Sequence, residues 1–205
     1  MYKRYPRDLI LDSVKYCEYN YNFMNFTANK IDSKTVKCIL NKLGFCDTEI
    51  EFVERIYSSN NSIKQIAKEY NFSEENSYSI LRNIKKKIGS LAFSFLYLKY
   101  ENGVLNYKFE KEDLIIVPIE LGYLNYDDLY TNRITNYKDM ITVYTIGNLA
   151  DYYLSHKLFA KTFNRDKDIR TRIYNFLLNQ EIITKQDEFT FRNQREFNKH
   201  YKYFS

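Results

Sequence analysis

The sequence is poor in the residues that break helices and in those that build metal or disulfide sites. Its 205 residues include two Pro, five Gly, three Cys, two His and no Trp. So few prolines and glycines favour a mainly helical globular protein over an all-β or disordered chain. Because the cysteines lack CxxC spacing and stand far from the histidines, we expect no metal, no other cofactor and no disulfide framework.

Long apolar runs and catalytic signatures are also missing. No stretch of 18 apolar residues occurs, and the beginning, MYKRYPRDLI, has no apolar core or small-residue cleavage site. We therefore expect a cytoplasmic protein with no membrane contact. The motifs GxxxxGK[ST], HExxH and GxSxG are absent as well, so we predict a protein that is not an enzyme and takes no small-molecule substrate.

The charge balance favours a polyanionic partner. The chain has 31 Lys and Arg against 26 Asp and Glu, a formal net charge of +5 with a pI of about 8.8. Lysine and arginine that neutralise phosphates gain affinity by releasing counterions, which makes nucleic acid a natural candidate. AT-rich codons by themselves raise the numbers of Lys, Asn and Tyr, so these counts are weaker evidence for a binding surface than the motifs are.

Apolar spacing and turn signals divide the chain into five parts. Residues 1–46 form a predicted helical extension of two helices that ends at Gly44, in which EYNYNFMNFT fits a strand or a helix equally well. Residues 47–94 contain three predicted helices. Residues 95–110 read as a hairpin or linker, because Asn102-Gly103 separates two alternating runs. Residues 111–184 return to helix near 125–140, 147–159 and 165–179, and residues 185–205 are a polar tail.

The stretch SIKQIAKEYNFSEENSYSILRNIKKKIG has the order of signals that a helix-turn-helix needs. Ser62 and Gln65 have capping-box spacing for the first helix. Asn71 tolerates the left-handed conformation at the turn, Phe72 packs against the turn, and Ser73 begins the second helix. A buried stripe is expected at Ile80, Ile84 and Ile88.

Over Leu43 to Leu91, this stretch and the preceding EIEFVERIYSSNN resemble region 4 of the housekeeping-type sigma factors. The resemblance implies that the second helix lies in the major groove of DNA. We predict that Tyr78, Ser79 and Arg82 face base edges or sugar, while Lys85 and Lys86 hold phosphate. The alternative is a helix-turn-helix that contacts only protein, with its lysine run as a solvated face.

Further along, RITNYKDMITVYTIGNL and TFNRDKDIRTRIYNFLLNQEI form a second group of signals. A glycine at the tight turn IGNL lets backbone N–H groups approach a phosphate, and a helix N-terminus favours the anion. A nearby arginine can enter a narrow A/T-rich minor groove without detailed base reading. Arg133 and Asn136 lie before this turn, in the helix that is expected to precede it. The alternative to DNA contact is that Arg133 is an ordinary surface arginine and Asn136 caps a helix.

From Asp113 to Ile183, these segments resemble the C-terminal domain of the RNA polymerase alpha subunit. The resemblance implies a helix-hairpin-helix-like bundle with DNA contacts from Arg133 and Asn136 and from a second turn before the last helix. At that second turn this chain has Asp166 and Asp168 where the family has Gly and Lys, and we predict that Arg165, Lys167 and Arg170 supply the DNA contacts instead. The expected fold is thus mainly α, a helix-turn-helix bundle plus a second small bundle, with a short β-hairpin as a link.

The two resemblances point to one function. We predict a DNA-binding transcription regulator that acts at promoters on AT-rich double-stranded DNA, in contact with RNA polymerase. One alternative is a subunit of a split sigma factor, or a mobile-element protein that binds or inhibits the polymerase. Another is a plasmid or phage replication or maintenance protein that binds DNA.

Overall fold

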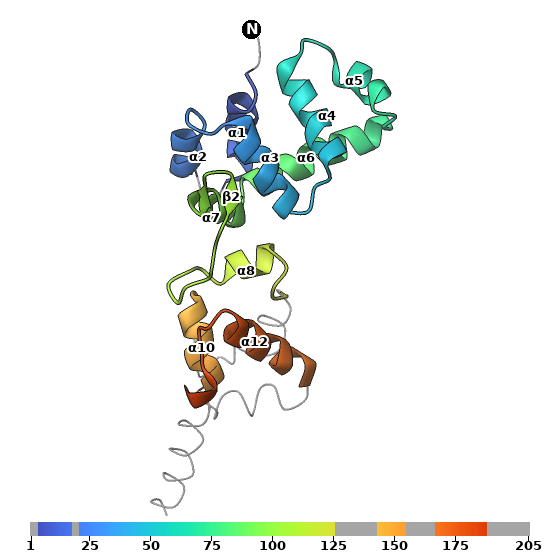
Figure 1. The fold of residues 1–205 in the computed structure, drawn as a ribbon. Helices are drawn as coiled ribbons and strands as arrows, with labels where there is room; N and C mark the ends of the chain where they lie inside the picture. The colour runs from blue at the N-terminus through green and yellow to red at the C-terminus, as the bar shows by residue number, and fades with distance from the viewer. Residues whose placement is uncertain (1–3, 18–20, 126–142, 155–166, 188–205) are drawn as a thin grey trace, which may run out of the picture. The chain divides into compact units, whose positions relative to one another are not determined.

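A computed structural model describes residues 4–17, 21–125, 143–154 and 167–187 (Figure 1). The chain is mainly helical, as predicted, with a small antiparallel two-stranded hairpin. It divides into two compact units, Met1–Tyr107 and Lys108–Ser205.

The N-terminal part of the first unit differs from the two helices expected. It consists of α1 (Arg7–Asp12), the short 3-10 helix η1 (Val14–Tyr16), α2 (Tyr21–Thr27) and α3 (Ser33–Lys42). The segment that fitted strand or helix equally is therefore helical over Tyr21–Thr27. After α1 the Ser13 hydroxyl donates to the Leu9 carbonyl (2.8 Å), a local bond that helps to end the helix. Asp32 caps α3 by accepting from the Thr35 N–H (2.8 Å).

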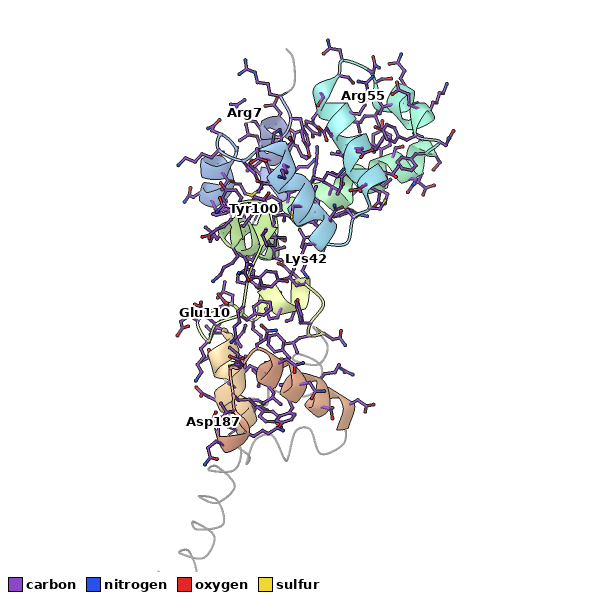
Figure 2. All side chains as sticks on the ribbon, in the orientation of Figure 1. Arg7, Lys42, Arg55, Tyr100, Glu110 and Asp187 are labelled. Atoms are coloured by element: carbon purple, nitrogen blue, oxygen red, sulfur yellow. The ribbon has the colours of Figure 1, made fainter. Side chains whose placement is uncertain are left out.

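Three helices follow where the sequence predicted them. They are α4 (Asp47–Ser58), α5 (Ile63–Glu69) and α6 (Glu74–Ile88). The Ser62–Gln65 capping box is confirmed, because each residue accepts from the backbone N–H of the other. Ser73 caps α6 by accepting from the Asn76 N–H (3.1 Å). Arg55 Nε lies 3.7 Å from Glu69 Oε2 and joins α4 to α5 (Figure 2).

The turn between α5 and α6 has the geometry that the sequence indicates. Asn71 adopts a φ of +56°, in the left-handed region that asparagine tolerates. The next amide, of Phe72, donates to the Ala67 carbonyl (2.9 Å). The Phe72 ring meets Phe52 of α4 edge-on, with centroids 5.2 Å apart, and stacks near Tyr70. These contacts fix the angle at which α6 leaves the turn.

Helix α6 is the centre of the first unit. It packs against α4 and α5 toward one end, and against α1, α3 and α7 (Leu91–Leu98) toward the other (Figure 1). Ile80, Ile84 and Ile88 are at most 5% exposed, which confirms the predicted buried stripe. The N-terminal helices and the helix-turn-helix thus share one core, whereas the sequence had suggested a separate extension.

The predicted hairpin is present, but it is shorter than the alternating runs suggested. Strand β1 (Tyr100–Glu101) pairs with β2 (Val104–Leu105), and Asn102 and Gly103 between them have φ values of +51° and +89°. Two successive positive φ angles are what a two-residue hairpin turn matching strand twist requires. The residues before it, LAFSFLYL, form α7, so the part from Phe95 to Leu98, which was expected to belong to the hairpin or linker, is helical. Ser90 caps this helix by accepting from the Phe93 N–H (3.3 Å).

The second unit contains α8 (Ile116–Glu120), α10 (Ile146–Leu154) and α12 (Lys167–Asn179). An isolated antiparallel bridge joins Leu114 and Thr145. The core of the second unit includes Phe109, whose ring meets Tyr123 and Phe176 edge-on. The other buried side chains of this core include Ile146, Leu149, Ile173 and Leu177. The helix expected near 125–140 and most of the polar tail lie outside the described residues.

Candidate nucleic-acid interface

One face of α6 remains open to solvent in the first unit. It carries a set of exposed residues that we call the α6 stripe: Glu75, Tyr78, Ser79, Arg82 and Lys86. At 3.6 residues per turn, these positions fall on one side of a helix. Four of the five helix-turn-helix residues predicted to contact DNA therefore share one surface. Tyr78 is 42% exposed, a large solvent contact for an aromatic side chain.

The opposite face of α6 holds the stripe in place. Besides its isoleucines, this face buries Ser77 completely. The Ser77 hydroxyl donates to the Ser73 carbonyl one turn earlier (2.8 Å), so a polar group is buried there without losing its hydrogen bond. The helix that presents the stripe is thus anchored along its length.

Charge changes sign along α6. Glu74 and Glu75 occupy the first turn, where the helix dipole favours acidic groups. Glu74 is partnered by Lys64 of α5, with Nζ and Oε1 3.0 Å apart, and this hydrogen bond raises the pKa of Lys64. Within the described ranges, neither Arg82 nor Lys86 forms an ion pair. The second half of the stripe therefore offers cations that are available to phosphate.

Lys85 does not lie on this stripe, and its predicted phosphate contact does not fit the structure. Its side chain is only 12% exposed, and its Nζ lies 3.2 Å from Asp12 Oδ2. The same ammonium stands 5.7 Å from the centroid of the Tyr57 ring. One position along a helix is a rotation of about 100°, which carries Lys85 from the open face to the edge covered by α1. Lys85 is a structural partner of Asp12.

The group of side chains around Asp12 was not predicted from the sequence. The Tyr57 hydroxyl donates to Asp12 Oδ2 (2.5 Å), so one carboxylate joins α1, α4 and α6. Burial, followed by this hydrogen bond, raises the pKa of Tyr57. Asp12 lies 45 residues from Tyr57 and 73 from Lys85, and no local periodicity links positions so far apart.

In the second unit, Gly147 serves the chain's own packing. Its N–H donates to the Lys111 carbonyl (2.8 Å), and the preceding Ile146 N–H donates to the Asp113 carbonyl (2.9 Å). The Asn148 N–H donates to Thr145 Oγ1 (3.2 Å). All three amides at the start of α10 therefore have acceptors within the protein. The expectation that a phosphate binds at this turn is therefore wrong, because each of these amides already donates to an acceptor within the protein.

We predict that Gly147→Ala destabilises the second unit by about 1 kcal/mol or more. A Cβ at this position would lie 3.0 Å from the Lys111 carbonyl oxygen and 3.2 Å from its Cβ, so backbone must shift to admit it. Thermal unfolding of the full chain measures the loss. Asp151→Ala, at an exposed position of α10, is the control and should leave the melting temperature unchanged. Equal melting temperatures for both variants would contradict the packing role of Gly147.

The remaining predicted contacts are not placed. Arg133, Asn136 and Arg165 lie outside the described residues. Lys167 and Arg170 begin α12, but only their backbone is described. The surface formed by the α6 stripe is therefore the candidate site with defined geometry.

In the described ranges, no group of three or more His, Cys, Asp or Glu residues is arranged to hold a metal ion. None of the helices described is both long enough and apolar enough to cross a membrane.

The two family resemblances thus rest on sequence motifs, one over Leu43 to Leu91 and the other over Asp113 to Ile183. In the structure, α5 and α6 are two helices joined by a turn at Asn71. No family model, curated protein or solved structure matches the chain.

Proposed function

We propose that this chain is a DNA-binding transcription regulator and that it binds double-stranded DNA through the α6 stripe. The observation that carries the proposal is the exposure of Tyr78, Ser79, Arg82 and Lys86 on one side of the second helix of a helix-turn-helix. The major groove, about 12 Å wide, admits an α-helix in this position.

The order of residue types along the stripe suits base contacts from its first half and phosphate contacts from its second half. Tyr78 and Ser79 lie in the first half of α6, the part that reaches base edges in helix-turn-helix proteins. The serine hydroxyl can donate to or accept from a base, and the tyrosine ring can contact a thymine methyl group. Arg82 and Lys86 follow one and two turns later. We assign both cations to phosphate, where they set the position of the helix. For Arg82 this replaces the contact with base edges or sugar that its place in the sequence suggested, because Arg82 lies one turn beyond Tyr78 and Ser79 and forms no ion pair within the described residues.

Promoter DNA and RNA polymerase belong to the same proposal. Their support is the resemblance of two segments of one chain to two parts of the transcription machinery that contact promoter DNA. On this proposal the second unit contributes contacts to AT-rich DNA from Arg133, Asn136, Arg165, Lys167 and Arg170. The split sigma subunit, the polymerase-binding mobile-element protein and the plasmid or phage maintenance protein remain the alternatives.

The test is the salt dependence of binding to a fluorescein-labelled AT-rich duplex, followed by fluorescence anisotropy. We expect Arg82→Ala and Lys86→Ala each to lower the slope of log K against log salt concentration by about 1, because each removes one phosphate contact. Lys34→Ala is the matched control. Lys34 is exposed on α3, and its Nζ lies 3.6 Å from where a Cβ of Gly103 would stand, beside the hairpin. Slopes for Arg82→Ala and Lys86→Ala equal to that of Lys34→Ala would contradict DNA binding by the stripe.

A second candidate, contact with a protein such as RNA polymerase, is favoured by the acidic start of α6. Glu75 lies on the stripe, where it repels a phosphate but can pair with a basic group of a protein partner. Glu75→Gln separates the two functions. If the stripe binds DNA, the variant should bind the duplex more tightly than the wild type. If it binds polymerase, the variant should be recovered less efficiently in a polymerase pull-down without DNA.

A further inference from the structure

The segment that contains α1 and η1 runs along one edge of α6. Asp12, at the end of α1, pairs with Lys85 (3.2 Å), and α1 packs against α6 (Figure 1). Four residues after Lys85, one helical turn further on, Gly89 follows the last residue of α6. The edge defined by Lys85 and Gly89 is therefore the line along which the N-terminal segment meets this helix.

At Gly89 the two segments approach so closely that a side chain would not fit without movement. A Cβ there would lie 3.1 Å from the backbone carbon of Tyr16, 3.1 Å from its Cβ and 3.1 Å from Cys17 Sγ. The φ of Gly89 is −73°, which any residue can adopt, so close packing is the reason for glycine at this position. The end of η1 is thus seated directly against the end of α6.

The segment seated at Gly89 carries one further cation, Lys15. Lys15 immediately precedes Tyr16, is exposed, and has its Nζ 5.0 Å from the centroid of the Tyr16 ring. Arg82 precedes Lys85 by three residues, so it lies next to the edge that the N-terminal segment covers. Lys86 lies one turn before Gly89. Gly89 comes seven residues after Arg82 and three after Lys86, spacings that place these positions on one side of a helix. The segment that carries Lys15 therefore meets α6 on the side of these two cations.

The acidic group nearest to this arrangement in the sequence is already neutralised. Asp12 accepts hydrogen bonds from both Lys85 and Tyr57, so its charge is compensated within the fold. This pairing also explains the position of Lys85 itself. Through Asp12, Lys85 holds the segment that carries Lys15 against α6.

We propose that η1 is a second element of the DNA surface and that Lys15 contacts the sugar-phosphate backbone of the duplex bound by the α6 stripe. This inference rests on the proposed function, and it adds a contact from a segment that lies outside the helix-turn-helix. A phosphate strand that passes Arg82 and Lys86 meets Lys15 at the end of the same helix. The contact positions the protein and carries no sequence preference.

The experiment uses the full chain and the same labelled AT-rich duplex at salt concentrations from about 50 to 200 mM. We expect Lys15→Ala to lower the slope of log K against log salt concentration by about 1, which corresponds to an affinity loss of about eightfold near 0.1 M salt. Lys15→Arg should keep the wild-type slope. Lys34→Ala, which also removes one exposed lysine charge, should leave both slope and affinity near those of the wild type.

The outcomes separate this inference from the proposed function. If Arg82→Ala lowers the slope while Lys15→Ala behaves like Lys34→Ala, the stripe binds DNA without η1 and the inference is overturned. If neither variant changes the slope, the proposed function fails and the inference fails with it. A loss in Lys15→Ala that Lys15→Arg does not restore would also overturn the inference, because a phosphate contact depends on charge.

Discussion

Replacing Phe52 with alanine should destabilise the first unit by about 3 to 5 kcal/mol, the largest effect that we expect from any single change. Phe52 is completely buried in α4. Its ring meets Phe72 edge-on at 5.2 Å and Tyr70 at 5.7 Å, so it supports the turn that directs α6. Alanine would remove these contacts and leave a cavity that the surrounding helices fill only in part.

Urea unfolding of the full chain, followed by circular dichroism, measures this loss. Phe52→Leu keeps most of the volume and should cost considerably less. Arg55→Ala, one helical turn away on the exposed side of α4, removes only a solvent-exposed ion pair and should change stability by about 1 kcal/mol or less. A loss below about 1 kcal/mol in Phe52→Ala would mean that the turn is held by other contacts.

The same change should weaken DNA binding without touching the stripe. Because the aromatic group around Phe52 fixes the turn, its loss lets α6 take more than one angle to α5. The slope of log K against log salt concentration should stay closer to the wild-type value in Phe52→Ala than in Arg82→Ala, because Phe52→Ala removes no cation. Affinity lost with an unchanged slope would thus identify a positioning defect.

The parts of the fold that could be predicted are those set by residues close together in sequence. The Ser62–Gln65 capping box, the left-handed Asn71 and the Asn102-Gly103 hairpin turn each depend on a few neighbouring residues. Such local preferences hold when the tertiary structure does not oppose them. The buried isoleucines of α6, on the face opposite the α6 stripe, were predictable for the same reason, since helical spacing alone defines that face.

The parts that could not be predicted depend on which segments meet in space. LAFSFLYL is nearly all apolar, and the alternation that suggested a hairpin from Phe95 onward does not by itself decide between helix and strand. The segment folds as a helix that is buried on several sides. The N-terminal helices pack against α6 through contacts across tens of residues. No turn or capping signal in the sequence indicates that the extension and the helix-turn-helix share a core.

The candidate site divides along the same line. The exposure of Tyr78, Ser79, Arg82 and Lys86 follows from the position of the isoleucines, because the open face is the one opposite the buried stripe. Lys85 lies between the two faces, and a residue at such an edge is open or covered according to what packs there. Gly147 is similar, because its close neighbour, Lys111, lies 36 residues earlier in the chain.

Asp12→Ala should destabilise the first unit by about 2 to 3 kcal/mol, although the Asp12 side chain is 51% exposed. The effect arises from what the change leaves behind. Lys85, only 12% exposed, would lose the carboxylate that lies 3.2 Å from its Nζ, and the buried Tyr57 hydroxyl would lose its hydrogen bond to Asp12. Urea unfolding of the variant against the wild type measures the difference.

Lys85→Met should be much milder, with a loss of about 1 kcal/mol or less, because the two partners are not equivalent. Methionine keeps the buried stem, and the half-exposed Asp12 retains both solvent and the hydrogen bond from Tyr57. In the double variant the unpaired lysine is absent, so the loss should be smaller than that of Asp12→Ala alone. Lys85→Met should also keep the wild-type salt slope for DNA, since Lys85 is engaged within the fold. If Lys85→Met instead lowered the slope of log K against log salt concentration by about 1, Lys85 would be a phosphate contact after all.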